Sequence, residues 1–130
     1  MYNLFQDLPE KARAVLGDVE NLTEERIEMV VKDYFKDYEE GEIANRGWCP
    51  HSSAYKVSKA VINAYTRILA KRYPKFCVNC VCPGFVKTDI NFHAGILSVE
   101  EGAESPVKLA LLPDGGPTGR FFLRKEEAPF

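Results

Sequence analysis

The stretch SSAYKVSKAVINAYTRILAKRYPKFCVNCVCPG, residues 52–84, decides the expected fold. A helix is predicted over 54–72, because apolar residues recur every three or four positions, at Ala54, Val57, Val61, Ala64, Ile68 and Leu69. Pro74 ends this pattern, and the apolar run that follows stops at Pro83-Gly84, as a buried strand does. A helix that feeds an apolar strand is half of a crossover unit. We therefore expect an α/β protein with a parallel sheet covered on both faces.

Two helices are expected before this stretch. The segment LPEKARAVLG allows a short helix with Pro9 near its start and Gly17 beyond its end. Asn21 or Thr23 can cap a second helix, which Gly41 ends. The second helix carries an apolar stripe made of Ile27, Val30, Val31, Tyr34, Phe35 and Tyr38.

A loop, a helix and one short strand are expected after the apolar run. Residues 84–97 are predicted to form the loop, and Ser98 with Glu101 makes a capping box for the next helix. Pro106 lies inside that helical pattern, so the helix should kink or properly begin there. The segment GRFFLR is predicted as the last strand, and the tail KEEAPF is expected to fray.

This order of elements predicts an incomplete doubly wound parallel sheet, rich in helices. Two expected strands are fewer than the roughly five or six that such a sheet usually has. No glycine-rich turn between a strand and a helix offers a cradle for phosphate. We therefore expect a single domain, 1–130, that corresponds to the back half of a larger fold.

Composition and charge exclude several classes of protein. The 130 residues carry a formal net charge of -2, which gives no basic surface for nucleic acid. No apolar run approaches the roughly 20 residues that cross a bilayer, so no membrane partner is expected. The first residues lack a basic segment followed by an apolar one, and the expected location is cytoplasmic.

Three cysteines follow a spacing that invites a zinc interpretation. Cys77, Cys80 and Cys82 read C-x2-C-x-C. On a strand, however, Cys77 and Cys80 point to opposite faces, and no second ligand pair follows at the right spacing. We therefore expect reduced, buried thiols and no metal.

The segment YKVSK contains the candidate chemistry. Tyr55 and Lys59 are four residues apart, so on a helix they lie on one face. A neighbouring ammonium stabilises the phenolate form of a tyrosine, which can then exchange a proton with a carbonyl oxygen. The spacing alone also occurs on ordinary surface helices. The Pro83-Gly84 turn adds to it, because α/β proteins bind ligands beyond the carboxyl ends of their strands.

AYKVSKAVINAYTRILAKRYP followed by VNCVCPGFVKTDIN resembles the C-terminal half of the short-chain dehydrogenase/reductase family. The similarity is strongest to its plant menthone/salutaridine reductase-like branch and the related carbonyl reductases. It covers about residues 50–124 and implies an incomplete Rossmann-like fold. In this resemblance, 1–47 is a helical flap-like insertion and 48–130 is the C-terminal half of the dehydrogenase core. The full-length form would be a monomer that acts on a small-molecule ketone or alcohol.

The resemblance also implies roles in the reaction. Tyr55 would be the catalytic acid/base, and Lys59 would stabilise its phenolate. Asn91 and His93 would lie in the loop that contacts the substrate.

The implied cofactor is NADP(H). Lys59 would bind the ribose of its nicotinamide half. Pro83 and Gly84 would lie beside the nicotinamide, and Val86 would offer backbone to the carboxamide. Thr88 would hydrogen-bond a cofactor phosphate or the carboxamide.

Several family features do not occur in this chain. The glycine-rich dinucleotide turn and the active-site asparagine are missing, and Ser52 and Ser53 are too close to Tyr55 to be the catalytic serine. Two functions therefore stay open. One is an NADP(H)-dependent oxidoreductase whose present chain lacks the half that binds cofactor phosphate and is inactive alone. The other is a truncated, non-catalytic product that acts, if at all, through protein association. A sugar-nucleotide epimerase is a third, disfavoured by the short tail after Thr88.

Overall fold

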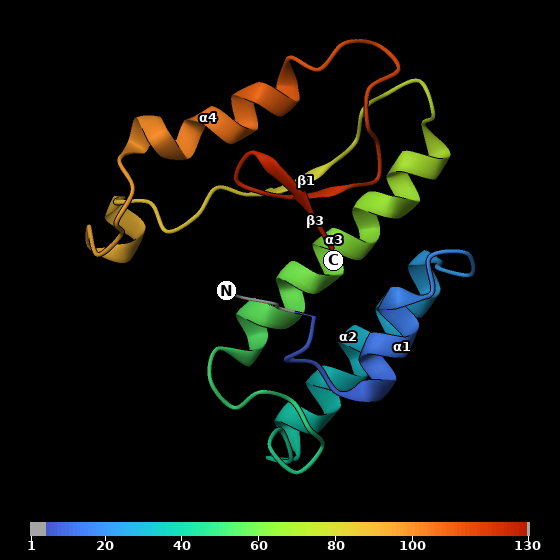
Figure 1. Ribbon diagram of the computed structural model, residues 1–130. Helices are drawn as coiled ribbons and strands as arrows, with labels where there is room; N and C mark the ends of the chain where they lie inside the picture. Colours follow the sequence, from blue (N-terminus) through green and yellow to red (C-terminus); the bar gives the residue numbers. More distant parts are fainter. Residues whose placement is uncertain (1–4, 130) are drawn as a thin grey trace. The chain divides into compact units, whose positions relative to one another are not determined.

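The computed structural model describes residues 5–129 and shows an α/β fold (Figure 1). Its contacts divide the chain into two compact units. The first runs through Ile68, and the second extends from Leu69 to Pro129. Helix α3 (Ser53–Arg72) contains the division.

The first unit is helical. Helix α1 (Glu10–Gly17) packs against helix α2 (Glu24–Glu39), which begins where Thr23 accepts a hydrogen bond from the Arg26 N–H at 3.2 Å. The sequence therefore predicted this cap correctly, whereas Asn21 instead binds Asp18. Gly41 follows α2 with a φ of 72°, in the left-handed region that suits glycine at a helix end.

The buried core of this unit joins all three helices. It contains Leu8, Ala12, Leu16, Ile27, Val30, Tyr34, Trp48, Val57, Ala60 and Ala64. Part of the predicted α2 stripe lies outside it, because Phe35 and Tyr38 are exposed. On α3 the face through Val57 and Ala64 is buried as predicted, and Ala54 is exposed.

The second unit contains a small mixed sheet. Strands β1 (Cys80–Cys82), β2 (Phe121–Leu123) and β3 (Glu126–Ala128) pair in the order β1-β2-β3. The β1–β2 pair is parallel, as expected, with Val81 opposite Phe122. The β2–β3 pair is antiparallel, so the predicted fraying of the tail was wrong. A two-residue turn with Arg124 at a φ of 56° folds the chain back and forms β3 (Figure 1).

The predicted strand before Pro83 is also shorter than its apolar sequence suggested. Before Cys80 a mixture of backbone and side-chain bonds replaces the regular strand ladder, and the Val78 carbonyl oxygen accepts from the Gly119 N–H at 2.7 Å. The Val78 N–H donates to the Thr118 hydroxyl at 3.0 Å, and the Asn79 side chain bonds the Pro117 carbonyl oxygen and the Arg120 N–H. A prediction from apolar composition alone therefore overestimated the length of this strand.

Helix α4 (Val99–Ala110) begins as predicted at a capping box. The Ser98 hydroxyl accepts from the Glu101 N–H at 3.2 Å, and the Glu101 carboxylate accepts from the Ser98 N–H at 2.8 Å. The helix continues through Pro106, so it does not begin there.

Candidate active site

Tyr55 and Lys59 lie one turn apart on an exposed face of α3. The Lys59 Nζ atom is 5.6 Å from the centroid of the Tyr55 ring, and Tyr55 is 57% exposed. Ile62, one further turn along this face, is 53% exposed. The ammonium therefore lies over the ring of the phenol, and the exposure of Tyr55 leaves it open to a proton acceptor.

The start of α3 is held by contacts that the sequence did not suggest. The Tyr34 hydroxyl on α2 lies 3.0 Å from the Ser53 hydroxyl, in the first residue of α3. Tyr34 is buried, and its ring meets the Trp48 ring edge-on with centroids 5.2 Å apart. The Trp48 indole N–H donates to Asp37 at 2.8 Å. This cluster fixes the helix two residues before Tyr55. Its members are far apart in sequence, so only their burial could have been foreseen.

Pro83 and Gly84 follow β1 directly, at the carboxyl end of the parallel pair. The Arg124 N–H, at the corresponding end of β2, donates to the Cys82 carbonyl oxygen at 2.8 Å. Gly84 has a φ of 94°, and a Cβ there would lie 2.7 Å from the Leu97 side chain. The backbone conformation therefore favours glycine at this turn, and a larger residue would also have to displace the end of the Leu97 side chain.

After the Gly84 turn, backbone hydrogen bonds at Val86 also hold the segment that follows β1 in place. Val86 makes a parallel bridge with Leu97, in which the Lys87 N–H donates to the Leu97 carbonyl oxygen at 2.9 Å. The Val86 carbonyl oxygen accepts from the Asn91 side chain at 2.7 Å. In such a bridge the N–H of the central residue points away from the partner strand. Within residues 5–129, no hydrogen bond that we find uses the Val86 N–H.

Asn91 organises the loop from inside. Its side-chain amide donates to Val86, and its side-chain oxygen accepts from the Thr88 N–H at 3.2 Å. The short helix η1 (Asp89–Asn91) ends at Asn91, so both contacts reach back to residues that precede this helix. His93, in contrast, is exposed and lies 3.0 Å from the equally exposed Asp89 carboxylate. The substrate roles of Asn91 and His93 stay predictions.

Two glycines close this loop against its neighbours. A Cβ on Gly95 would lie 2.2 Å from the Val86 carbonyl carbon, and one on Gly102 of α4 would lie 2.5 Å from the Val86 side chain. Such separations leave room only for hydrogen. In the sequence, only the presence of glycine at these two positions hinted at such contacts.

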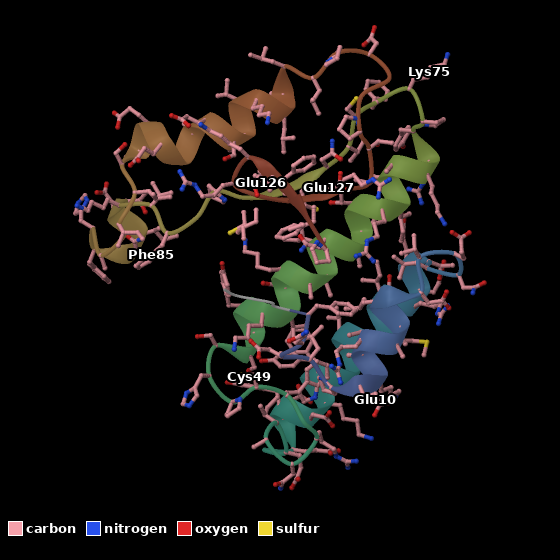
Figure 2. All side chains as sticks on the ribbon, viewed as in Figure 1. Glu10, Cys49, Lys75, Phe85, Glu126 and Glu127 are labelled. Carbon is pink, nitrogen blue, oxygen red and sulfur yellow. The ribbon has the colours of Figure 1, made fainter. Side chains whose placement is uncertain are left out.

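The loop also presents large apolar side chains. Ile90, Phe92 and Ile96 are 90%, 91% and 78% exposed. Phe85, labelled in Figure 2, precedes them in the same segment and is exposed as well. Exposed apolar surface of this kind marks a site that another molecule or segment covers.

The predicted site residues thus fall into two sets. Tyr55 and Lys59 share one helical face, and Pro83, Gly84, Val86, Thr88 and Asn91 share one turn-and-loop segment. In the described part of the chain, no three His, Cys, Asp or Glu side chains gather where they could hold a metal ion. The helices that the structure describes are also too short or too polar to cross a bilayer.

Comparisons with known proteins agree on one family. Residues 41–114, more than half of the chain, match the family model described as enoyl-(acyl carrier protein) reductase. The chain is 53% identical over 128 residues to short-chain dehydrogenase/reductase 1 of Saponaria officinalis, covering 98% of this chain and 42% of that protein. It is 59% identical over 115 residues to (-)-isopiperitenone reductase of Mentha piperita, covering 88% and 37%.

A solved structure shows the same fold. Salutaridine reductase from Papaver somniferum superposes with a TM-score of 0.85 at 52% identity, covering 92% of this chain and 40% of that one. This confirms the predicted partial Rossmann-like fold. The chain spans about two fifths of the length of the relatives that it matches.

Proposed function

Because the chain belongs to the short-chain dehydrogenase/reductase family, we propose that it supplies the proton-donor part of an NADP(H)-dependent oxidoreductase that interconverts a ketone and an alcohol. The observation that carries the proposal is the Tyr55–Lys59 pair on an exposed helical face. The exposed Tyr55 hydroxyl gives a proton to the carbonyl oxygen during reduction and takes it back during oxidation. The Lys59 ammonium stabilises the phenolate that forms.

The segment after β1 fits the nicotinamide end of the cofactor. NADPH, when bound, supplies the hydride. Gly84 leaves no side chain at the turn, and the Val86 N–H, unused within residues 5–129, matches a carboxamide oxygen. Thr88, two residues after Val86 at the N-cap of η1, adds a hydroxyl, and the Lys59 ammonium suits ribose hydroxyls. Asn91 acts by positioning Val86 and Thr88, because both of its amide contacts are made to them.

The substrate contact is proposed for the loop that follows. Ile90, Phe92 and Ile96 offer apolar surface, which suits a carbonyl compound with a hydrocarbon body. His93 lies between them with an exposed imidazole. We propose a cytoplasmic location on the basis of four free cysteines, since thiols stay reduced there. The segment through residue 47 is proposed to act as a flap over the substrate.

A chimera tests this proposal. Residues 5–129 replace the matching segment of Papaver somniferum salutaridine reductase, and reduction of a panel of ketones is followed by NADPH absorbance. We expect turnover of at least one ketone. Tyr55→Phe should lower kcat by about 10²- to 10⁴-fold while cofactor binding is retained, because only proton transfer is lost.

The matched control is Tyr65→Phe, an exposed tyrosine further along α3. It should leave kcat within about twofold, as a surface change does. A folded chimera that binds NADPH and keeps full activity with Tyr55→Phe would show that Tyr55 is not the acid/base.

A second function is favoured by the exposed apolar side chains. Ile62 and Tyr65 on α3 in the first unit, and separately Ile90, Phe92 and Ile96 beyond β1 in the second, offer apolar surface that suits association with another polypeptide. In that case the chain acts without catalysis of its own. Sedimentation of the pure chain with separately produced candidate reductase segments distinguishes the two functions, because association without turnover supports the second.

A further inference from the structure

Cys49 lies in a cluster of charged groups that the proposed reaction does not use. Figure 2 shows it in the loop between α2 and α3. The Lys56 Nζ atom donates to the Cys49 sulfur at 2.9 Å, and Lys56 lies on the first turn of α3. The Asp7 carboxylate lies 2.8 Å from the same nitrogen. The three groups come from separate segments, so the fold has built a carboxylate–ammonium–sulfur chain.

The Lys56 ammonium in this row of three groups is largely shielded from solvent. The Lys56 side chain is only 11% exposed, although lysine usually extends into solvent. The Asp7 carboxylate, and after it the Cys49 sulfur, raise the pKa of Lys56 above its ordinary value. Lys56 therefore places a positive charge at a defined position beside the sulfur, unlike a lysine that extends freely into solvent.

The sulfur responds to that charge. Lys56, and next the backbone of His51, hold the pKa of Cys49 below its ordinary value. The His51 carbonyl oxygen is 3.5 Å from the sulfur, a longer contact than that with Lys56. The shorter contact with the ammonium favours the thiolate. Cys49 is also partly exposed, so a small solute reaches it.

We propose that Cys49 is an oxidation site, a thiolate held by Lys56 that hydrogen peroxide converts to a sulfenic acid. The thiolate attacks one peroxide oxygen, so an S–O bond forms while the O–O bond breaks. Sulfur loses two electrons and the peroxide gains them. The leaving hydroxide takes a proton from the Lys56 ammonium and becomes water, and Lys56 recovers its proton from solvent. The neutral product leaves Lys56 with Asp7 as its charged partner.

The other cysteines provide internal controls. Cys80 is buried, whereas Cys77 and Cys82 are as partly exposed as Cys49. The Cys77 sulfur contacts the Pro113 carbonyl oxygen at 3.7 Å, a neutral acceptor. No lysine or arginine contact is found at the Cys77 or Cys82 sulfur within residues 5–129. Exposure alone therefore does not separate Cys49 from Cys77 and Cys82, but the lysine contact does.

The test measures all four cysteines in the full chain at neutral pH. The protein is mixed with hydrogen peroxide and a 1,3-dicarbonyl probe for sulfenic acid, and labelled peptides are followed by mass spectrometry. We expect Cys49 to be labelled about tenfold faster than Cys82, because an ordinary thiol is only a few per cent thiolate at neutral pH. Equal rates at Cys49 and at Cys82 or Cys77 overturn the proposal without any variant.

Two substitutions examine the role of the lysine. Lys56→Gln should bring the Cys49 rate to within about twofold of the Cys82 rate, whereas Lys56→Arg should keep most of the difference. Cys82 should label at the same rate in both, and circular dichroism checks that each is folded. Asp7→Asn should leave the Cys49 rate unchanged or raise it, because the Asp7 charge raises the pKa of Cys49 while Lys56 stays protonated at neutral pH without it. An unchanged Cys49 rate in folded Lys56→Gln overturns the assignment.

Discussion

The two units of the chain hold their functional residues in different ways. Tyr55 and Lys59 lie on a helix whose opposite face is buried among apolar side chains from three helices. The loop from Gly84 to Leu97 has few buried side chains and is fixed by glycine contacts and amide hydrogen bonds. A proton donor is thus positioned by packing, and the proposed cofactor edge by backbone geometry. The packed helix tolerates changes in its exposed side chains. The loop, in contrast, depends on individual glycine contacts and individual hydrogen bonds.

The largest expected effect comes from the packed unit. Leu16 is 1% exposed, and Leu16→Ala should lower the free energy of unfolding by about 3–4 kcal/mol, because it removes buried methyl groups and leaves a cavity. Chemical denaturation measures the loss. Leu111→Ala is the matched control, since Leu111 is 77% exposed and should cost almost nothing.

Hydrogen exchange on Leu16→Ala sharpens the comparison of the units. Amides of α1 and α2 should lose protection, while those of β1 and β2 should lose less if the units open separately. Equal loss in both would mean that the chain unfolds as one cooperative body.

The next effect is expected at Gly95. Gly95→Ala places a methyl group against the Val86 backbone, so we expect a loss of roughly 2–3 kcal/mol, localised in the second unit. Gly115→Ala isolates backbone strain, because Gly115 has a φ of 78° and open space around it. It should cost about 1–2 kcal/mol. Denaturation midpoints compare them, and a smaller cost at Gly95 would contradict the tight contact.

A smaller effect is expected from the loop amide. Asn91→Ala removes two hydrogen bonds to the loop backbone, so the cost should be about 1–2 kcal/mol. His93→Ala, in the same loop, removes only an exposed pair with Asp89 and should cost about 0–0.5 kcal/mol. Thermal denaturation of both variants ranks them. If His93→Ala were the more damaging, the loop would depend on the exposed His93–Asp89 pair more than on the hydrogen bonds of the Asn91 side chain.

The smallest effect is a pH dependence in the first unit. Arg26, and after it Asn21, hold the pKa of Asp18 below its ordinary value. A lowered pKa in the folded state stabilises the fold above the pKa of the unfolded chain. This stability is lost as the pH falls through the lower, folded-state pKa. Asp18→Asn should therefore lower Tm by about a degree at pH 7, and the difference should shrink as the pH falls below about 4.

The pair Glu28 and Lys32 is the control for Asp18. Both side chains are largely exposed at successive turns of α2, so Glu28→Gln should leave Tm nearly unchanged at every pH. A difference between Asp18→Asn and the parent that grew on acidification would contradict the sign of the effect.

Local chemistry explains what the sequence predicted well. Thr23 and Ser98 begin helices because a hydroxyl beside an acidic first turn satisfies open N–H groups, and that signal is contained in four residues. The shared face of Tyr55 and Lys59 follows from helical spacing alone. The strand ending at Pro83-Gly84 was placed correctly, although its length was not.

What the sequence missed depends on contacts between distant segments. Tyr34 meets Ser53, and Lys56 meets both Asp7 and Cys49, across separations that no periodicity encodes. Strand β3 was missed because Glu126 and Glu127, two of its three residues, are charged and exposed, as residues of a frayed tail are. Its pairing is decided by β2, which supplies the hydrogen-bonding partner.

The order of strands in the sheet has a consequence for assembly. β3 closes one side of the sheet, and its Glu126 and Glu127, labelled in Figure 2, place negative charge along that border. On the other side, β1 borders no further strand in residues 5–129, and its sequence is uncharged. Charged borders repel incoming strands, whereas uncharged ones accept them. Growth of the sheet, by a further strand or by self-association at high concentration, should therefore proceed from β1 alone.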